Sequence, residues 1–118
     1  MWFKEFWEID AWKEARKLTN DIYKINFSND FSIRDQVRKS SLSIMANIAE
    51  GFGRQSKSEF LRFLDIARGS CSETQSHLFV CHDLGYLNRD RFKELLSLCQ
   101  KIGKIITGLM KKLKSKTS

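Results

Sequence analysis

Apolar residues recur along this chain at steps of three and four, the spacing that lines up side chains on one face of a helix. The first stretch carries Ala11, Ala15, Leu18, Ile22 and Ile25 in this pattern. Three further stretches repeat it. Together they predict helices over about residues 10–26, 32–51, 56–84 and 88–114.

Polar residues and glycines between these stretches predict where the helices begin and end. Ser32 is the expected N-cap of the second helix, and Ser56 with Glu59 has the spacing of a capping box at the third. Gly51 is expected to end the second helix in the left-handed conformation that glycine adopts readily. Gly85 is expected to end the third helix, and the segment LGYLN that contains it is expected to form a short connector to the fourth.

The fourth helix has strict heptad spacing, and its lysines lie off the apolar seam. Asn88 stands where an N-cap is expected. Four long helices with short connectors predict an all-α protein with an antiparallel up-down four-helix bundle. We expect residues 1–118 to form a single domain, with residues 115–118 as a disordered tail. The predicted seam consists of Phe92, Leu95, Cys99, Ile102, Ile106, Leu109 and Leu113.

The net charge of +7 is concentrated at one end of the chain. Residues 1–87 hold equal numbers of basic and acidic residues, whereas residues 88–118 hold nine Lys and Arg against Asp90 and Glu94. A one-sided basic segment suggests an acidic partner, most simply nucleic acid. A lysine-rich helix face that is merely solvated is the alternative.

Several features predict a cytoplasmic protein without a membrane partner. No apolar run approaches the roughly 20 residues that cross a bilayer, and the N-terminus lacks the features of a signal peptide. Cys71, Cys81 and Cys99 fall in apolar helical patterns, so buried free thiols in a reducing compartment are expected.

Catalytic and metal-binding motifs are weak. His77 and Cys81 are four residues apart, but Cys71 lies about 120° from His77 around the helix, so Cys71, His77, Cys81 and His82 make a poor metal site. We find no nucleophile elbow and no phosphate-binding glycine loop in the sequence. We therefore expect no enzymatic activity, no metal and no cofactor.

Several segments together resemble one known family. In the first helix they are Phe6, Ile9, Trp12, Ala15, Leu18 and Tyr23, followed by Gln36 and Arg38. Three motifs complete the set: SIMANIAEG at Ser43–Gly51, EFLRFLDIARGSCSE at Glu59–Glu73 and LGYL at Leu84–Leu87.

On these residues the chain resembles the four-helix-bundle proteins encoded within intervening sequences of bacterial 23S ribosomal RNA genes. The family commonly has a proline in the first connector, where this chain has FSNDFS. The resemblance implies a bundle that assembles into a ring-like homopentamer. It also implies kinship to accessory proteins of diversity-generating retroelements, which bind a reverse transcriptase and nucleic acid. It implies no enzymatic activity.

Some polar residues have an expected architectural role. Glu73 stands between core positions, so we expect it to pair with Arg38 or Arg68, because a carboxylate buried alone is costly. Asn47 is expected to bind neighbouring backbone at the end of the second helix, near Gly51. Glu50 lies at the unfavourable end of the helix dipole, so Arg54 or Lys57 should compensate its charge. A phosphate held by Arg54, Lys57 and the free amides of the third helix is the functional alternative.

The leading functional interpretation is a homo-oligomer that binds nucleic acid, RNA in first place, through phosphate contacts. The rival interpretation is a scaffold whose ring docks a partner protein. The first-rank candidate contacts are Lys101, Lys104, Lys111, Lys112, Lys114 and Lys116. The second-rank candidates are Arg34, Arg38, Lys39, Arg54, Lys57 and Arg62. The aromatic residues Trp2, Phe3, Phe6 and Trp7 suit a hydrophobic staple or a subunit contact better than base stacking.

Overall fold

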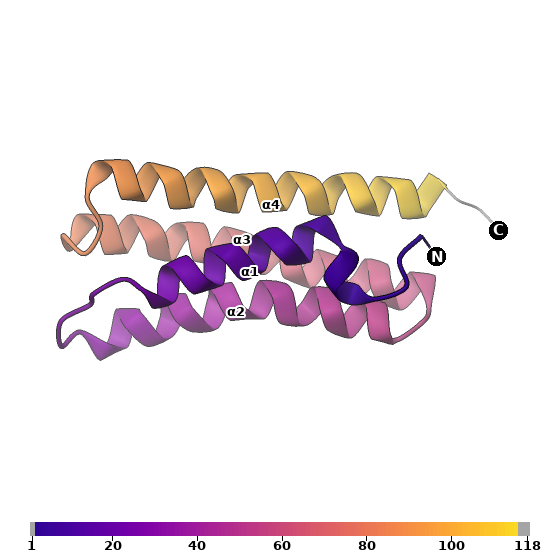
Figure 1. Cartoon of the computed structure of the whole chain (residues 1–118), viewed down its shortest axis with the longest axis horizontal. Helices are drawn as coiled ribbons and strands as arrows, with labels where there is room; N and C mark the ends of the chain where they lie inside the picture. Colours follow the sequence, from indigo (N-terminus) through magenta and orange to yellow (C-terminus); the bar gives the residue numbers. More distant parts are fainter. Residues whose placement is uncertain (1, 116–118) are drawn as a thin grey trace.

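Four helices form an antiparallel up-down bundle, as predicted (Figure 1). The computed structural model describes residues 2–115. Residues 116–118 of the expected tail, with Lys116, lie outside them. A 3-10 turn, η1, precedes the bundle, which measures 50 × 21 × 19 Å. The elements are η1 (Phe6–Glu8), α1 (Asp10–Tyr23), α2 (Phe31–Gly53), α3 (Lys57–Asp83) and α4 (Arg89–Ser115).

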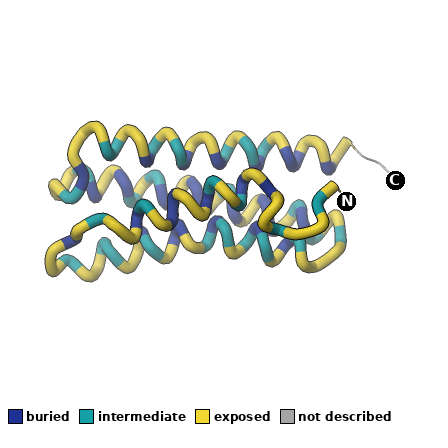
Figure 2. The backbone as a smooth tube through the Cα atoms, in the orientation of Figure 1, coloured by how far each residue is buried: buried dark blue, intermediate teal, exposed yellow. Residues whose placement is uncertain are grey.

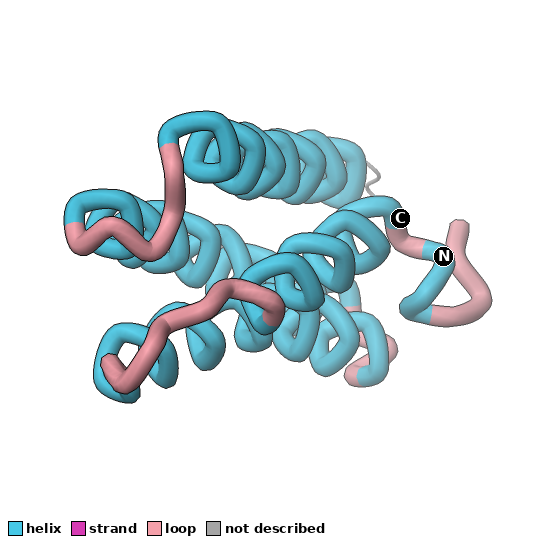
Figure 3. The backbone as a smooth tube through the Cα atoms, turned by 60° about the vertical axis from the view of Figure 1, so that its left-hand side comes forward, coloured by secondary structure: helices cyan, strands magenta, loops and turns pink. Residues whose placement is uncertain are grey.

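The helices follow one another around the bundle. Each packs against its sequence neighbour, and α4 returns to pack against α1. The α1–α2 and α3–α4 connectors lie at the same end, as the turned view in Figure 3 shows. The most extensive contact is between α2 and α3. Helices α3 and α4, whose shared surface groove is described below, are therefore adjacent in both sequence and space.

The predicted apolar faces form the core. Ala11, Ala15, Leu18 and Ile22 of α1 are completely buried. Every predicted seam position of α4 is buried except Phe92, which is half-buried and stacks on His82 with ring centroids 4.7 Å apart. Buried positions face the inside of the bundle along each helix (Figure 2).

The α1–α2 connector differs from its prediction. Helix α1 ends at Tyr23 rather than near residue 26, and Ser28 then adopts a left-handed φ of 54°. The N-cap of α2 is Asp30, not Ser32: its carboxylate accepts a hydrogen bond from the Ile33 amide at 3.3 Å. The Tyr86 hydroxyl donates to the other Asp30 oxygen at 2.9 Å. Asp30 therefore both caps α2 and anchors the α3–α4 connector.

Gly51 does not end α2, contrary to the prediction. The helix continues to Gly53, and the left-handed residue beyond it is Gln55, with a φ of 55°. Gly51 is instead buried inside the helix, where an added Cβ would lie 2.5 Å from the Cβ of Phe63. Close packing of α3 against α2, rather than backbone conformation, therefore requires glycine at this position.

The predicted positions of Ser56, Gly85 and Asn88 at helix ends are confirmed. The Ser56 hydroxyl accepts a hydrogen bond from the Glu59 amide at 3.3 Å at the start of α3. Gly85 has a φ of +83° just beyond α3. The Asn88 side chain accepts from the Arg91 amide at 2.8 Å and caps α4.

Small hydroxyl side chains line the contact between α2 and α3. Thr74 donates to the Ser40 hydroxyl at 2.9 Å, and the hydroxyls of Ser43 and Ser70 lie 3.0 Å apart. The Asn47 amide donates to the Ser43 carbonyl at 2.8 Å, which is the backbone contact expected of Asn47. These hydrogen bonds satisfy polar groups between the helices. The small side chains let α2 and α3 approach closely, as Gly51 does further along α2.

Candidate nucleic-acid interface

The lysines of α4 are distributed over several faces of the helix. Lys101 lies toward α1, and its ammonium group forms an ion pair with Glu14 at 3.2 Å. Lys104 and Lys111 line a groove against α3. Lys112 lines a smaller recess with Asp10 and residues of the N-terminal segment, and Lys114 is exposed near the end of α4. The basic segment is thus not one continuous patch.

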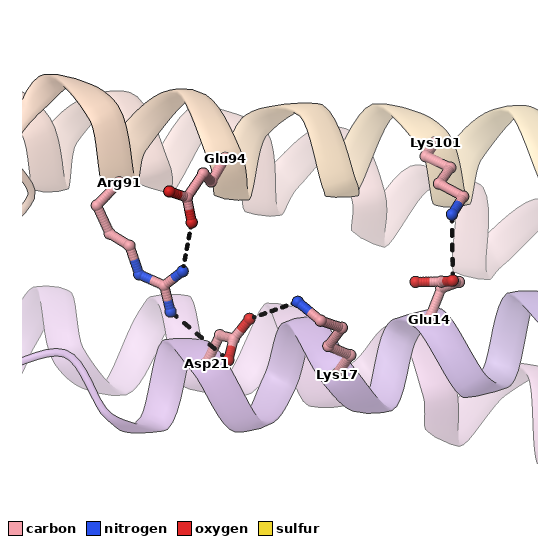
Figure 4. A network of polar contacts seen from close by, with 6 residues as sticks. All are labelled: Glu14, Lys17, Asp21, Arg91, Glu94 and Lys101. Carbon is pink, nitrogen blue, oxygen red and sulfur yellow. Dashed lines mark hydrogen bonds and ion pairs between the residues drawn. The ribbon is translucent and has the colours of Figure 1, made fainter.

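The seam between α1 and α4 is occupied by alternating charges, as the close view in Figure 4 shows. Asp21 accepts from Lys17 at 3.2 Å and pairs with Arg91 at 3.5 Å, and Arg91 also pairs with Glu94 at 2.9 Å. Pairs of this kind at a surface contribute little to stability. These pairs matter more for binding than for stability. The carboxylates of Asp21 and Glu14 offset the positive charge that Arg91 and Lys101 would otherwise offer to a phosphate.

The groove between α3 and α4 has a different character. Its volume is about 660 Å³. Among the described residues that line it, none is acidic. Cations come from both helices, Arg68 from α3 and Lys104 and Lys111 from α4, with neutral polar side chains between them. Arg68 pairs with Asp65 outside the recess, whereas no residue within 2–115 forms an ion pair with Lys104 or Lys111, so these two lysines present the uncompensated positive charge on this face.

The basic residues at the start of α2 are held by aromatic rings and a carboxylate. The Arg34 guanidinium lies 4.5 Å from the Phe31 ring centroid and pairs with Asp35 at 2.8 Å. Arg38 lies over Tyr23 at 4.7 Å and donates to the Tyr23 carbonyl at 3.1 Å. Its Nε is buried without a hydrogen-bond partner within residues 2–115. Arg38 thus joins the end of α1 to α2.

Lys39, next along α2, is exposed. It stays a candidate for contact with a partner.

A second basic cluster surrounds Phe63 at the α2–α3 joint. The guanidinium groups of Arg54 and Arg62 lie 5.2 and 4.5 Å from the Phe63 ring centroid. Arg54 pairs with Glu50 at 3.8 Å, which is the compensation expected for Glu50. Arg62 binds Glu59 at 2.8 Å, and this hydrogen bond lowers the pKa of the Glu59 carboxyl. These arginines already have carboxylate partners, so they are weaker phosphate ligands than the groove lysines.

Lys57 begins α3 beside this cluster and is exposed. The phosphate alternative for Arg54 and Lys57 stays a prediction.

The expected pairing of Glu73 is wrong. Glu73 is exposed, and no residue within 2–115 forms an ion pair with it. Arg68 instead pairs with Asp65 at 2.6 Å and donates to the Thr107 hydroxyl at 3.3 Å. The reason is geometric: Thr74 is buried, and the 100° turn between consecutive helical residues directs Glu73 toward solvent.

The cysteines and histidines that could carry chemistry have packing roles. Cys81 is completely buried, and burial, with a smaller contribution from Asp30, raises its thiol pKa to about 11. Cys99 donates to the Cys71 carbonyl at 3.3 Å, and a side-chain hydrogen bond with Cys71, followed by burial, raises the pKa of the Cys99 thiol. His77 contacts the Ser40 hydroxyl at 3.1 Å, and the ring nitrogen Nδ1 of His82 lies 2.9 Å from the Leu87 carbonyl.

Within residues 2–115, no three His, Cys, Asp or Glu side chains are grouped as a metal site would require. Helices of the described part of the chain are too short or too polar to cross a membrane.

The aromatic N-terminal segment is partly packed. Phe6 contacts Trp12 edge to face with ring centroids 5.1 Å apart, and Phe3 packs against the core. Trp2 and Trp7 are exposed.

Sequence reasoning missed the neutral half of the groove, which consists of Ser72, Gln75, Gln100, Gly103, Thr107 and Gly108. Two glycines in the middle of α4, where no turn occurs, were the available signal.

Comparisons with known proteins place these features in context. The model of a family described as 23S rRNA-intervening sequence protein matches residues 7–108. A crystal structure from Bacteroides thetaiotaomicron VPI-5482 is similar, with a TM-score of 0.78 and 24% sequence identity. The similarity covers 86% of this chain and 98% of that chain, whose protein is described as having unknown function and belonging to the S23 ribosomal protein family. At this identity the similarity shows the fold alone. A search of curated proteins gives no match.

Proposed function

We propose that this chain, which belongs to the 23S rRNA-intervening sequence protein family, is a non-enzymatic homo-oligomer that binds RNA or another nucleic acid through its basic surfaces. The observation that carries the proposal is the α3–α4 groove, where Arg68, Lys104 and Lys111 meet without an acidic lining residue among those described. A phosphate backbone is the partner that matches such a surface, because it carries a regular array of negative charges.

The distribution of charge along the chain supports this proposal. The excess of +7 arises in residues 88–118, most of which form α4. A ring of several copies, a homopentamer if the family resemblance extends to assembly, would multiply this excess. The positive potential of such a ring would attract nucleic acid at long range and would weaken as salt is added.

The reactive side chains support a binding role rather than catalysis. Cys71, Cys81 and Cys99 are free, buried thiols. Buried cysteines without a disulfide fit a cytoplasmic location, which we include in the proposal. A buried thiol with a raised pKa is a poor nucleophile, because the thiolate is the reactive form.

A partner-protein scaffold is the second candidate, and one observation favours it. Phe79 and Val80 near the end of α3 and Leu84 just beyond it are exposed, with 51%, 39% and 54% of their surface accessible. Exposed apolar side chains that lie together commonly mark protein contacts. This surface would serve subunit packing or a docked protein, and the lysines would then only maintain solubility.

An electrophoretic mobility-shift experiment with structured ribosomal RNA fragments at low salt tests the proposal. The wild-type protein should retard the RNA, and substitution of Lys111, Lys112 and Lys114 by Gln should weaken the retardation. Substitution is preferable to truncation after Leu109, because Met110 and Leu113 belong to the core. No retardation at low salt would refute the proposal, and retardation that the triple variant leaves unchanged would remove the last turns of α4 from the interface.

The scaffold candidate makes a different prediction for the purified protein. If nucleic acid is the partner, the wild-type preparation should carry it and show a high ratio of absorbance at 260 to 280 nm. Under the scaffold interpretation that ratio should be that of protein alone, and the triple variant should not change it.

A further inference from the structure

The groove between α3 and α4 combines charge with a row of hydrogen-bonding side chains. Its cations come from both walls, and Gln75 and Gln100 provide amide groups between them. Hydroxyl groups come from Ser72 and Thr107. Hydroxyl and amide groups can donate to phosphate oxygens and can bind ribose hydroxyls.

Two glycines keep this groove open. Gly103 and Gly108 lie inside α4, and a Cβ added to either would meet nothing within 4 Å. Neither glycine is therefore required by packing, and neither has a positive φ. Each costs α4 about 1 kcal/mol relative to alanine. Both glycines line the groove, about 140° apart around α4, so the absence of side chains leaves both of its edges on α4 open; Gly108 also lines the smaller recess beside Lys112.

The cations of the groove are arranged along its length. Arg68 is held in place by Asp65 at 2.6 Å and by Thr107 of the opposite helix at 3.3 Å. Lys104 and Lys111 are seven residues apart, which places them on one face of α4 about 10 Å from each other along the axis. A positioned guanidinium group loses less conformational freedom when it binds an anion.

We propose that the α3–α4 groove binds the sugar–phosphate backbone of a single strand of RNA, with Lys104, Lys111 and Arg68 on successive phosphates. This inference rests on the proposed function and specifies where and in which form the nucleic acid binds. The recess of about 660 Å³ between α3 and α4 has room for part of one strand, and its amides and hydroxyls lie where they can reach ribose as well as phosphate groups. Residues 100–111 span about 16 Å of helix, which accommodates a few nucleotides.

A helix of a second copy is the competing occupant, because glycines also permit close helix packing. The groove lining disfavours it. Among the described residues that line the groove, Cys71 is the one apolar residue larger than glycine, and it is buried, whereas a docked helix needs several apolar anchors. The α4 wall of the groove also carries Lys104 and Lys111, whose positive charges two copies would bring together.

Fluorescence anisotropy with a labelled oligouridine about 12 nucleotides long tests the inference on the full-length protein. The first variant is Lys104→Gln with Lys111→Gln. Its matched control is Lys13→Gln with Lys24→Gln, which removes two exposed positive charges elsewhere. The second variant is Gly103→Leu, which fills the groove. Its control is Gly69→Leu, at an exposed glycine of α3 that does not line the groove and has open space around it.

The groove variants should bind much more weakly than their controls. Loss of two phosphate contacts should also reduce the slope of log affinity against log salt by about 1.4, whereas the control pair should change it little. Gly103→Leu should weaken binding at least several-fold more than Gly69→Leu. Circular dichroism and gel filtration report folding and assembly for every variant.

Three results would overturn the inference in distinguishable ways. If the wild-type protein binds no RNA, the proposed function fails, and the groove assignment fails with it. If the wild-type protein binds but both lysine pairs weaken binding equally, the function stands and the groove is not the site. If Gly103→Leu changes the assembled mass and leaves RNA affinity intact, the groove is a contact between copies.

Discussion

Gly51 provides a sharp test of how α2 and α3 are packed. The change Gly51→Ala adds a single methyl group at a buried position of α2. That methyl carbon would lie 2.5 Å from the Cβ of Phe63 and 3.3 Å from a ring carbon of Phe60. The Cβ of Phe63 is fixed to the backbone of α3, so the contact cannot be relieved by rotating a side chain. The two helices must separate.

The expected magnitude follows from two opposing effects. Carbon atoms prefer contacts of about 3.5–4.0 Å, so α2 and α3 must move apart by about 1 Å. Overpacking of this kind costs about 1–3 kcal/mol. Alanine favours the helix by about 1 kcal/mol over glycine. The net destabilisation should therefore be up to about 2 kcal/mol. At Gly53, where an added Cβ meets nothing within 4 Å, the same change should stabilise by up to about 1 kcal/mol.

Urea unfolding followed by circular dichroism measures both variants at one protein concentration, since assembly would make stability concentration-dependent. Gly51→Ala should lower the urea midpoint and Gly53→Ala should raise it, with the slope of the free energy against urea unchanged. If Gly51→Ala is as stable as Gly53→Ala, the close packing against Phe63 is not what requires glycine at position 51.

Three further changes test other contacts. Asp30→Ala should destabilise the protein by about 0.5–2 kcal/mol through loss of the α2 cap. In a double-mutant cycle its effect should couple to that of Tyr86→Phe, and additive effects would exclude the hydrogen bond between the two side chains. The folded chain retains the Cys81 proton, with a pKa of about 11, that the unfolded chain loses near 9.0. Stability should therefore fall as pH rises through that interval, less steeply in Cys81→Ala. Glu73→Gln should leave the melting temperature unchanged, and a clear decrease would mean that its carboxylate has a partner after all.

The helices and the core could be predicted from sequence because burial follows the helical period. Once Leu95, Cys99 and Ile102 were read as a seam, their burial followed from the 3.6-residue turn. Helix ends were less predictable. Asp30 and Ser32 both suit an N-cap, and the choice depends on where the chain turns and on Tyr86, which is distant in sequence.

The roles of Gly51 and Glu73 depended on tertiary structure. A glycine at the end of an apolar run suits a helix terminus as well as a close helix contact, and only the position of Phe63 distinguishes them. Glu73 is adjacent in sequence to buried Thr74, but one residue is 100° of helical turn. The groove itself depends on how far apart α3 and α4 lie, which no pattern within one helix specifies.

The salt dependence of RNA affinity tests the central claim most directly. Anisotropy titrations of one RNA between about 50 and 200 mM salt should give a straight, steep fall of log affinity with log salt. A protein that contacts six or more phosphates should lose about a thousandfold in affinity over this range. An affinity that does not change with salt, or no binding at the lowest salt, would contradict the account.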